Sequence, residues 1–135
     1  MITADEIMYE GTEHERREKF FTTKSQPFMG TRGHIRRAFS ALRKKGYFAR
    51  MNFWCCGGCA VADIPDGTEK WVFFHEQADE RLRRDGECYL GWGGDSAEII
   101  QTLNDNGVDI LWVDGDKSSG MRMCNIEPDD NSYRW

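Results

Sequence analysis

The clearest pattern of apolar and polar positions in the chain lies between residues 31 and 45. Apolar side chains recur there at helical spacing, at Ile35, Ala38, Phe39 and Leu42. Thr31 is suited to cap the start of a helix, and Gly46 follows three consecutive cations, which favour a helix C-terminus. The pattern therefore predicts an amphipathic helix over residues 31–45.

The rest of the chain alternates short apolar runs with turn residues and amphipathic stretches. Strands are predicted, in chain order, over residues 48–55, 71–74, 87–92, 108–113 and 121–126. Further helices are predicted over residues 78–85 and 95–106, each followed by a glycine. This order predicts an α+β fold with a single mixed sheet of about four to five strands and helices packed on it.

The apolar faces of these elements also predict which side chains form the core. The residues expected to be buried are Ile35, Phe39, Leu42, Val72, Phe74, Leu90, Ile99, Leu103 and Leu111. With 135 residues, 39% of them hydrophobic, the chain is long enough for one domain with a substantial core. We expect a polar, partly helical N-terminal extension over residues 1–29, the α+β domain over residues 30–127 and a C-terminal tail over residues 128–135.

Charge is distributed unevenly along the chain. The formal net charge is −5, which argues against a nucleic-acid-binding protein, yet residues 30–50 carry seven cations and no acid. Four of these cations are predicted to lie away from the apolar stripe of the helix and to meet an acidic protein surface: Arg36, Arg37, Arg43 and Lys44. The alternative is a solvated helix face whose cations pair with carboxylates of the same domain.

The N-terminal residues and the number of cysteines predict the cellular compartment of the protein. The first residues have neither the basic nor the apolar region of a secretory signal, and no apolar run is long enough to span a membrane. The number of cysteines, five, is odd. We therefore expect a cytoplasmic protein with reduced thiols. A small acidic protein would also suit a phage or mobile-element origin, although no residue pattern indicates one.

The cysteines provide the most specific chemical signal, because three of the five lie within the run Cys55-Cys56-Gly57-Gly58-Cys59. Cys56 and Cys59 have the C-x-x-C spacing that lets two thiolates share one zinc ion. His75 is the predicted third ligand, and the remaining cysteines, Cys55, Cys88 and Cys124, are the reserve candidates. Two alternatives stay open, namely thiols that only pack and thiols that carry out redox chemistry.

Catalysis is a further alternative for the same residues. A thiol of Cys56 or Cys59 with His75 and Asp79 would supply the residue types of a nucleophilic triad. We expect instead that His75 and Asp79 have structural roles next to a helix. We also expect burial among aromatic side chains to raise the pKa of these thiols, which would slow their reaction with iodoacetamide.

Several segments from Gly46 onward resemble an uncharacterised bacterial domain family of unknown function. The most specific are the CCxxC run and the segment with His75, Gln77 and Asp79, where this chain has Ala78 before the aspartate. The resemblance implies a compact domain and no particular reaction. We therefore predict a non-enzymatic module that binds a macromolecule or has a regulatory role, with a Cys/His-centred metal- or thiol-dependent enzyme as the alternative.

Overall fold

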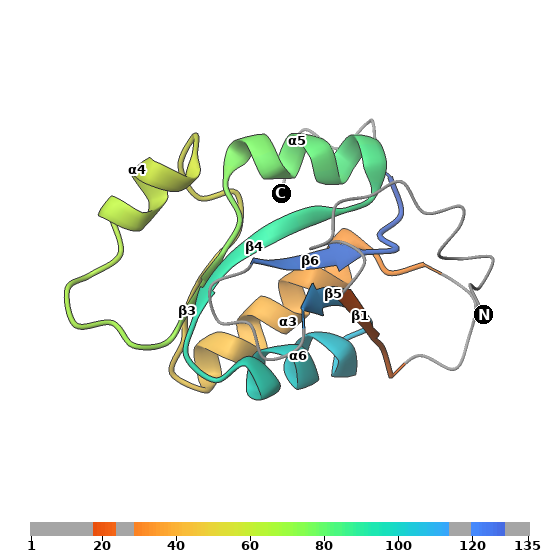
Figure 1. Ribbon diagram of the computed structural model, residues 1–135, viewed down its shortest axis with the longest axis horizontal. Coiled ribbons are helices and arrows are strands. Elements are labelled where there is room, and N and C mark those ends of the chain that lie inside the picture. Colours follow the sequence, from red (N-terminus) through yellow and green to blue (C-terminus); the bar gives the residue numbers. More distant parts are fainter. Residues whose placement is uncertain (1–17, 24–28, 114–119, 129–135) are drawn as a thin grey trace, which may run out of the picture.

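The structure is a computed structural model that describes residues 18–23, 29–113 and 120–128. In chain order the described elements, labelled as in Figure 1, are β1 (Glu18–Phe21), α3 (Arg32–Lys44), β2 (Phe48–Arg50), α4 (Gly57–Ala62), β3 (Trp71–Phe73), α5 (Glu76–Asp85), β4 (Cys88–Gly93), α6 (Ser96–Asp105), β5 (Asp109–Val113) and β6 (Met121–Cys124). The predicted helical stretch before Phe20 and most of the predicted C-terminal tail lie outside the described residues.

The six strands form one sheet in the order β1-β5-β6-β4-β3-β2. Only β2 and β3 run parallel, and the other neighbouring pairs are antiparallel. The parallel pair needs a crossover connection, and the chain makes it with the segment that contains the cysteine run and α4. The predicted α+β fold with a single mixed sheet is therefore confirmed, with six strands in place of the four to five expected.

The additional strand is β1, which comes from the segment expected to be a helical extension. Glu18 to Phe21 pair antiparallel with β5, and Phe21 lies opposite Ile110. The charged residues of this extension, which include Glu18 and Lys19, made a helix the simpler prediction. A partner strand more than eighty residues away decided otherwise, because local sequence does not show which distant strand edge is available.

The buried apolar side chains form one cluster between the sheet and its helices. In Figure 1 α3 and α6 lie side by side below the sheet, and α5 lies above it. Eight of the nine predicted core residues are buried, and Leu111 is the exception. In β5 it is Ile110 and Trp112 that point into the core, because alternate residues of a strand point to opposite faces.

Local sequence explains where the helices begin and end. The Thr31 hydroxyl accepts the N–H of His34, and the His34 ring accepts the N–H of Thr31, which makes a reciprocal cap for α3. The Asp95 carboxylate accepts the first N–H groups of α6. Gly86 ends α5 in the left-handed conformation at φ +78°. None of the helices in the described part of the chain is long and apolar enough to cross a membrane.

Candidate thiol site

The cysteine run begins on the connection from β2 and continues into the first turn of α4, in a segment that projects from the body of the molecule at the left of Figure 1. The predicted strand over residues 48–55 ends at Arg50, since Asn52 and Trp54 have φ values of +50° and +63°. Left-handed backbone at non-glycine residues is unfavourable and ends the strand. The turn changes the direction of the chain immediately before Cys55.

This turn is attached to the domain by backbone hydrogen bonds and by aromatic packing. The Phe53 N–H donates to the carbonyl of Phe74, and the Glu76 N–H donates to the carbonyl of Trp54, both at 2.8 Å. The Phe53 ring packs edge-to-face against Phe73, with 6.0 Å between ring centroids. These contacts fix the position at which the cysteine run leaves the sheet.

A second attachment joins the start of the cysteine segment to the end of α4. The Trp54 indole Nε1 donates to a carboxylate oxygen of Asp63 at 3.0 Å. Asp63 is the C-terminal cap residue of α4, so this bond joins the two ends of the segment that carries the thiols. The Trp54 ring is nevertheless half exposed, and the buried residue of α4 is Ala60.

Three thiols meet in this segment. The Sγ atom of Cys55 lies 3.9 Å from that of Cys56 and 3.7 Å from that of Cys59, and all three sulfurs lie within 4.8 Å of one another. Cys55 and Cys59 are exposed and Cys56 is half-buried. Two sulfurs bound to one zinc ion at tetrahedral angles are about 3.8 Å apart. The three thiols could therefore hold a metal ion without a large rearrangement.

Cys56 and Cys59 have pKa values shifted in opposite directions. The pKa of Cys56 is lowered mainly by a hydrogen bond from the backbone N–H of Cys59, and further by hydrogen bonds from the thiols of Cys59 and Cys55. The hydrogen bond from Cys59 to the Cys56 sulfur in turn raises the pKa of Cys59 to about 11. The expectation that aromatic burial raises both pKa values is therefore wrong for Cys56. Cys56 is the first of the pair to become a thiolate because N–H donors stabilise its negative charge.

His75, the predicted third ligand, lies next to this segment but is not a member of the group of close ligand atoms. It is the N-cap residue of α5, and its Nδ1 accepts the N–H of Ala78 at 3.1 Å. A Cβ atom at Gly57 would be 3.8 Å from Cδ2 of the ring, which places the imidazole beside the start of α4. Partial burial of the ring lowers the pKa of His75.

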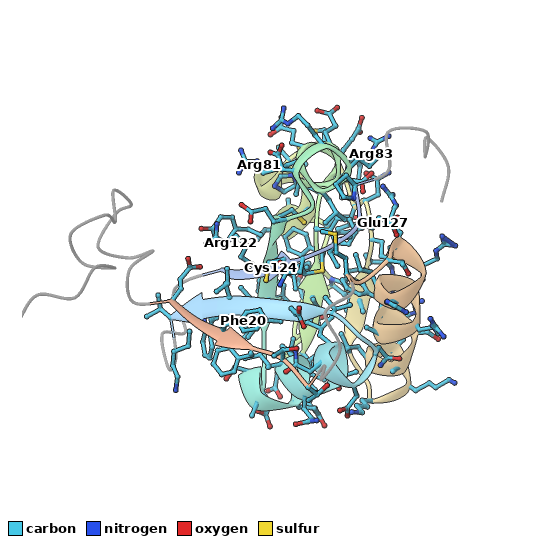
Figure 2. The ribbon with its side chains drawn as sticks, turned by 90° about the vertical axis from the view of Figure 1, so that its right-hand side faces the viewer. Phe20, Arg81, Arg83, Arg122, Cys124 and Glu127 are labelled. Atoms are coloured by element: carbon cyan, nitrogen blue, oxygen red, sulfur yellow. The ribbon has the colours of Figure 1, made fainter. Side chains whose placement is uncertain are left out.

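Asp79, the acidic residue of the alternative catalytic triad, is buried between cations. Its carboxylate lies 3.0 Å from a guanidinium nitrogen of Arg32 and 3.5 Å from one of Arg83. Figure 2 views α5 nearly end-on and shows Arg81 and Arg83 on opposite flanks of the helix. Burial raises the pKa of Asp79 despite the two cations. This arrangement ties α5 to the start of α3 and is a structural role, as expected for Asp79.

The reserve cysteines, Cys88 and Cys124, lie elsewhere. Both are buried, on β4 and β6 respectively, and neither belongs to the thiol group. Burial strongly raises the pKa of Cys88. Cys55, in contrast, is a member of the thiol group, although it was only a reserve candidate. A strand through residue 55 would have turned Cys55 and Cys56 to opposite faces, and the left-handed residues before them remove that separation.

The four cations predicted to bind a partner are all exposed and all lie on α3, but they do not make the same contacts. Arg43 donates from its guanidinium to the carbonyl of Ala49 at 2.8 Å, on the edge strand β2. Among the described residues, no ion pair joins Arg37 or Lys44 to a carboxylate. Arg36, the remaining one of the four cations, does interact with other groups of the protein. Arg32, in the same stretch, is buried against Asp79.

The fold and the site together define a small α+β protein with a cluster of three thiols on a projecting crossover segment. The chain belongs to the family described as Domain of unknown function (DUF6891), whose model matches residues 3–124. The expected membership in a family of unknown function is confirmed, and the match also includes residues before Gly46. No curated protein and no solved structure matches the chain. The function must therefore be argued from the site.

Proposed function

We propose that the protein binds a thiophilic metal ion, zinc, through the thiolates of Cys55, Cys56 and Cys59. The observation that supports this is the spacing of the sulfurs, 3.7 and 3.9 Å from Cys55 to its two neighbours. These distances match the separation of about 3.8 Å expected for two thiolates on one tetrahedral zinc ion. Soft sulfur donors also favour zinc and Cu(I) over magnesium or calcium.

The protonation of the thiols supports a pH-dependent affinity. Cys56 has a lowered pKa, whereas the pKa of Cys59 is raised to about 11, so at neutral pH the ion must displace the Cys59 proton. We expect zinc affinity to increase with pH through the neutral range, because fewer protons then compete with the metal.

The surroundings favour a binding or regulatory role over catalysis. His75 uses Nδ1 to cap α5, and Asp79 is held between two guanidinium groups. Neither His75 nor Asp79, the two groups of the alternative triad, is therefore arranged to activate a thiol or a metal-bound water. A metal ion bound here would instead cross-link Cys55 to the start of α4 and fix the shape of the projecting segment.

Metal content of the purified protein tests this proposal directly. The chain should be expressed without a histidine tag, purified under reducing conditions and analysed for zinc by elemental analysis. We expect one zinc ion per chain, lost in Cys56→Ser and Cys59→Ser and retained in the control Cys88→Ala, which removes a buried thiol outside the cluster. Substoichiometric metal in the parent protein, together with unchanged thermal stability after zinc addition, would contradict the proposal.

A second function, thiol–disulfide exchange, is favoured by the place of the C-x-x-C pair at the start of α4. Cys56 is the N-cap residue of this helix, and N–H groups of Cys59 and Gly58 stabilise its thiolate. The Cys56 thiolate would attack an external disulfide, form a mixed disulfide and release one thiolate. Cys59, after losing its proton, would then attack the Cys56 sulfur, form the Cys56–Cys59 disulfide and release the second thiolate.

Alkylation of the metal-free protein distinguishes this second function. Exchange chemistry predicts that iodoacetamide modifies Cys56 well before Cys59 at neutral pH, and that glutathione disulfide converts the pair to an intramolecular disulfide. Equal, slow alkylation of both thiols and no protein disulfide at any glutathione ratio would leave metal binding as the function of the cluster.

A further inference from the structure

The thiol cluster provides three ligands, whereas a tetrahedral zinc ion takes four. The remaining cysteines of the chain cannot complete the set, because Cys88 and Cys124 are buried in other strands. Within the part of the chain that the structure describes, no carboxylate or imidazole joins the three sulfurs in one group of close ligand atoms. A zinc ion held by these three thiolates would therefore have one position left for a ligand from outside the described residues.

Among the described residues, His75 has its imidazole beside the start of α4, and its hydrogen bonding makes it unsuited to this position. Its Nδ1 accepts the N–H of Ala78, so the neutral ring carries its proton on Nε2. Binding a metal through Nε2 would require that proton to move to Nδ1, and the cap of α5 would be lost. The ring that holds the start of α5 is consequently not available as a ligand without a change in this helix.

The site is also accessible from outside. Cys55 and Cys59 are exposed, and Trp54, immediately before Cys55, has 50% of its surface exposed. The segment projects from the domain, and no described strand or helix covers it in Figure 1. A side chain from another protein can therefore approach the ion on its open side.

The charge of the loaded site indicates which ligand chemistry fits there. Three thiolates on one divalent zinc ion leave a net charge of −1, on a chain whose own net charge is −5. A fourth thiolate would add another negative charge and, near neutral pH, would first have to lose its proton. A neutral imidazole adds no charge, and most of it is unprotonated at that pH.

Resting on the proposed zinc site, we propose that its fourth ligand is a histidine imidazole supplied by a partner protein, so that the ion bridges the two chains. The macromolecule-binding role predicted for this protein then has a definite contact, in which the metal joins the projecting segment to the partner. A zinc ion at this site would take water as its fourth ligand in the absence of the partner.

Cobalt substitution tests this inference with imidazole itself as the probe. The untagged, metal-free full chain is loaded with Co²⁺, whose thiolate-to-cobalt charge-transfer band counts thiolates and whose visible bands report the other ligand. We expect added imidazole to shift the visible bands and leave the charge-transfer intensity unchanged. Glutathione binding as a fourth thiolate would instead raise that intensity by about one third.

The outcomes separate the inference from the proposed function on which it rests. If no charge-transfer band forms with Co²⁺, the thiol site itself is refuted. If the band forms but imidazole changes nothing, or glutathione acts at lower concentration than imidazole, the site stands and the imidazole inference is overturned.

Histidines of the same chain are tested by two variants. His75→Asn keeps a side-chain oxygen that can cap α5 but has no imidazole, and His14→Asn removes the histidine that lies outside the described residues. We expect the cobalt spectrum of both variants, before and after imidazole, to match that of the parent protein. A spectrum that loses nitrogen ligation in either variant would show that the chain supplies its own fourth ligand and would overturn the inference.

Discussion

Replacing Gly86 by alanine should destabilise the domain far more than the same replacement at Gly67. Both glycines have left-handed backbone, with φ values of +78° at Gly86 and +82° at Gly67. They differ in their surroundings, because a Cβ at Gly86 would overlap the carbonyl oxygen of Ile126, whereas a Cβ at Gly67 would have no atom within 4 Å. The pair therefore separates backbone strain from steric overlap.

The magnitude follows from the contacts around Ile126. The left-handed conformation costs an alanine about 1–2 kcal/mol at either position. At Gly86 the overlap adds about 1–3 kcal/mol, as expected for overpacking of a site that cannot relax. The Ile126 backbone cannot easily move away, since its N–H donates to Gly86 and its neighbours on both sides bond to Gly30. We expect a loss of about 2–5 kcal/mol for Gly86→Ala and about 1–2 kcal/mol for Gly67→Ala.

Urea unfolding followed by far-ultraviolet circular dichroism measures both variants. The gain from restricting the unfolded chain is similar for two glycine-to-alanine changes, so the difference between the variants reports the overlap at Ile126. Equal m-values would show that the same surface unfolds in each. Losses that agree within about 0.5 kcal/mol would refute the packing of the end of α5 against Ile126.

Three further outcomes check other parts of the structure. Phe74→Ala should lower the free energy of unfolding by about 3–5 kcal/mol, because the ring is fully buried, while Val61→Ala at a position 55% exposed should change it by less than about 0.5 kcal/mol. In the metal-free protein, burial lowers the pKa of His75. The contribution of His75 to stability is therefore complete above about pH 6.5 and is lost as the pH falls below that value. His75→Asn should reduce this pH dependence of the free energy of unfolding, measured by urea titrations. The pair Arg37→Glu and Lys44→Glu should weaken binding to an acidic partner in a pull-down and leave the unfolding midpoint unchanged, whereas unaltered binding would show that this face is only solvated.

The thiol site shows how far sequence reasoning reached. The run of cysteines indicated a metal site, but the ligand set was drawn from spacing along the chain, which favoured Cys56, Cys59 and His75. The structure brings Cys55 to the other two sulfurs and gives Nδ1 of His75 to a helix cap. Left-handed backbone at Asn52 and Trp54 causes the first difference, and no local propensity favours that conformation for tryptophan.

The basic stretch between residues 30 and 50 shows that a count of charges also does not reveal which cations are exposed. Counting the charges between residues 30 and 50 included Arg32 among the seven cations and placed Arg43 on an exposed partner-binding face. Arg32 is buried against Asp79, and Arg43 donates to the carbonyl of Ala49 on the edge strand β2. The partners of both arginines come from outside the helix, so their roles depend on how α3 is placed against α5 and β2.

The sequence by itself determined the helices α3, α5 and α6, the side of each that faces the core, and the α+β class, but not the short helix α4. These features depend on periods of two and 3.6 residues and on caps such as Thr31 and Asp95, which act within one turn. Only the tertiary structure decided that β1 joins β5, that Asp79 meets Arg32, and that three thiols converge beside edge strand β2. Each of these needs groups that are distant along the chain, or a backbone conformation that surrounding contacts impose, and short-range preferences carry no information about either.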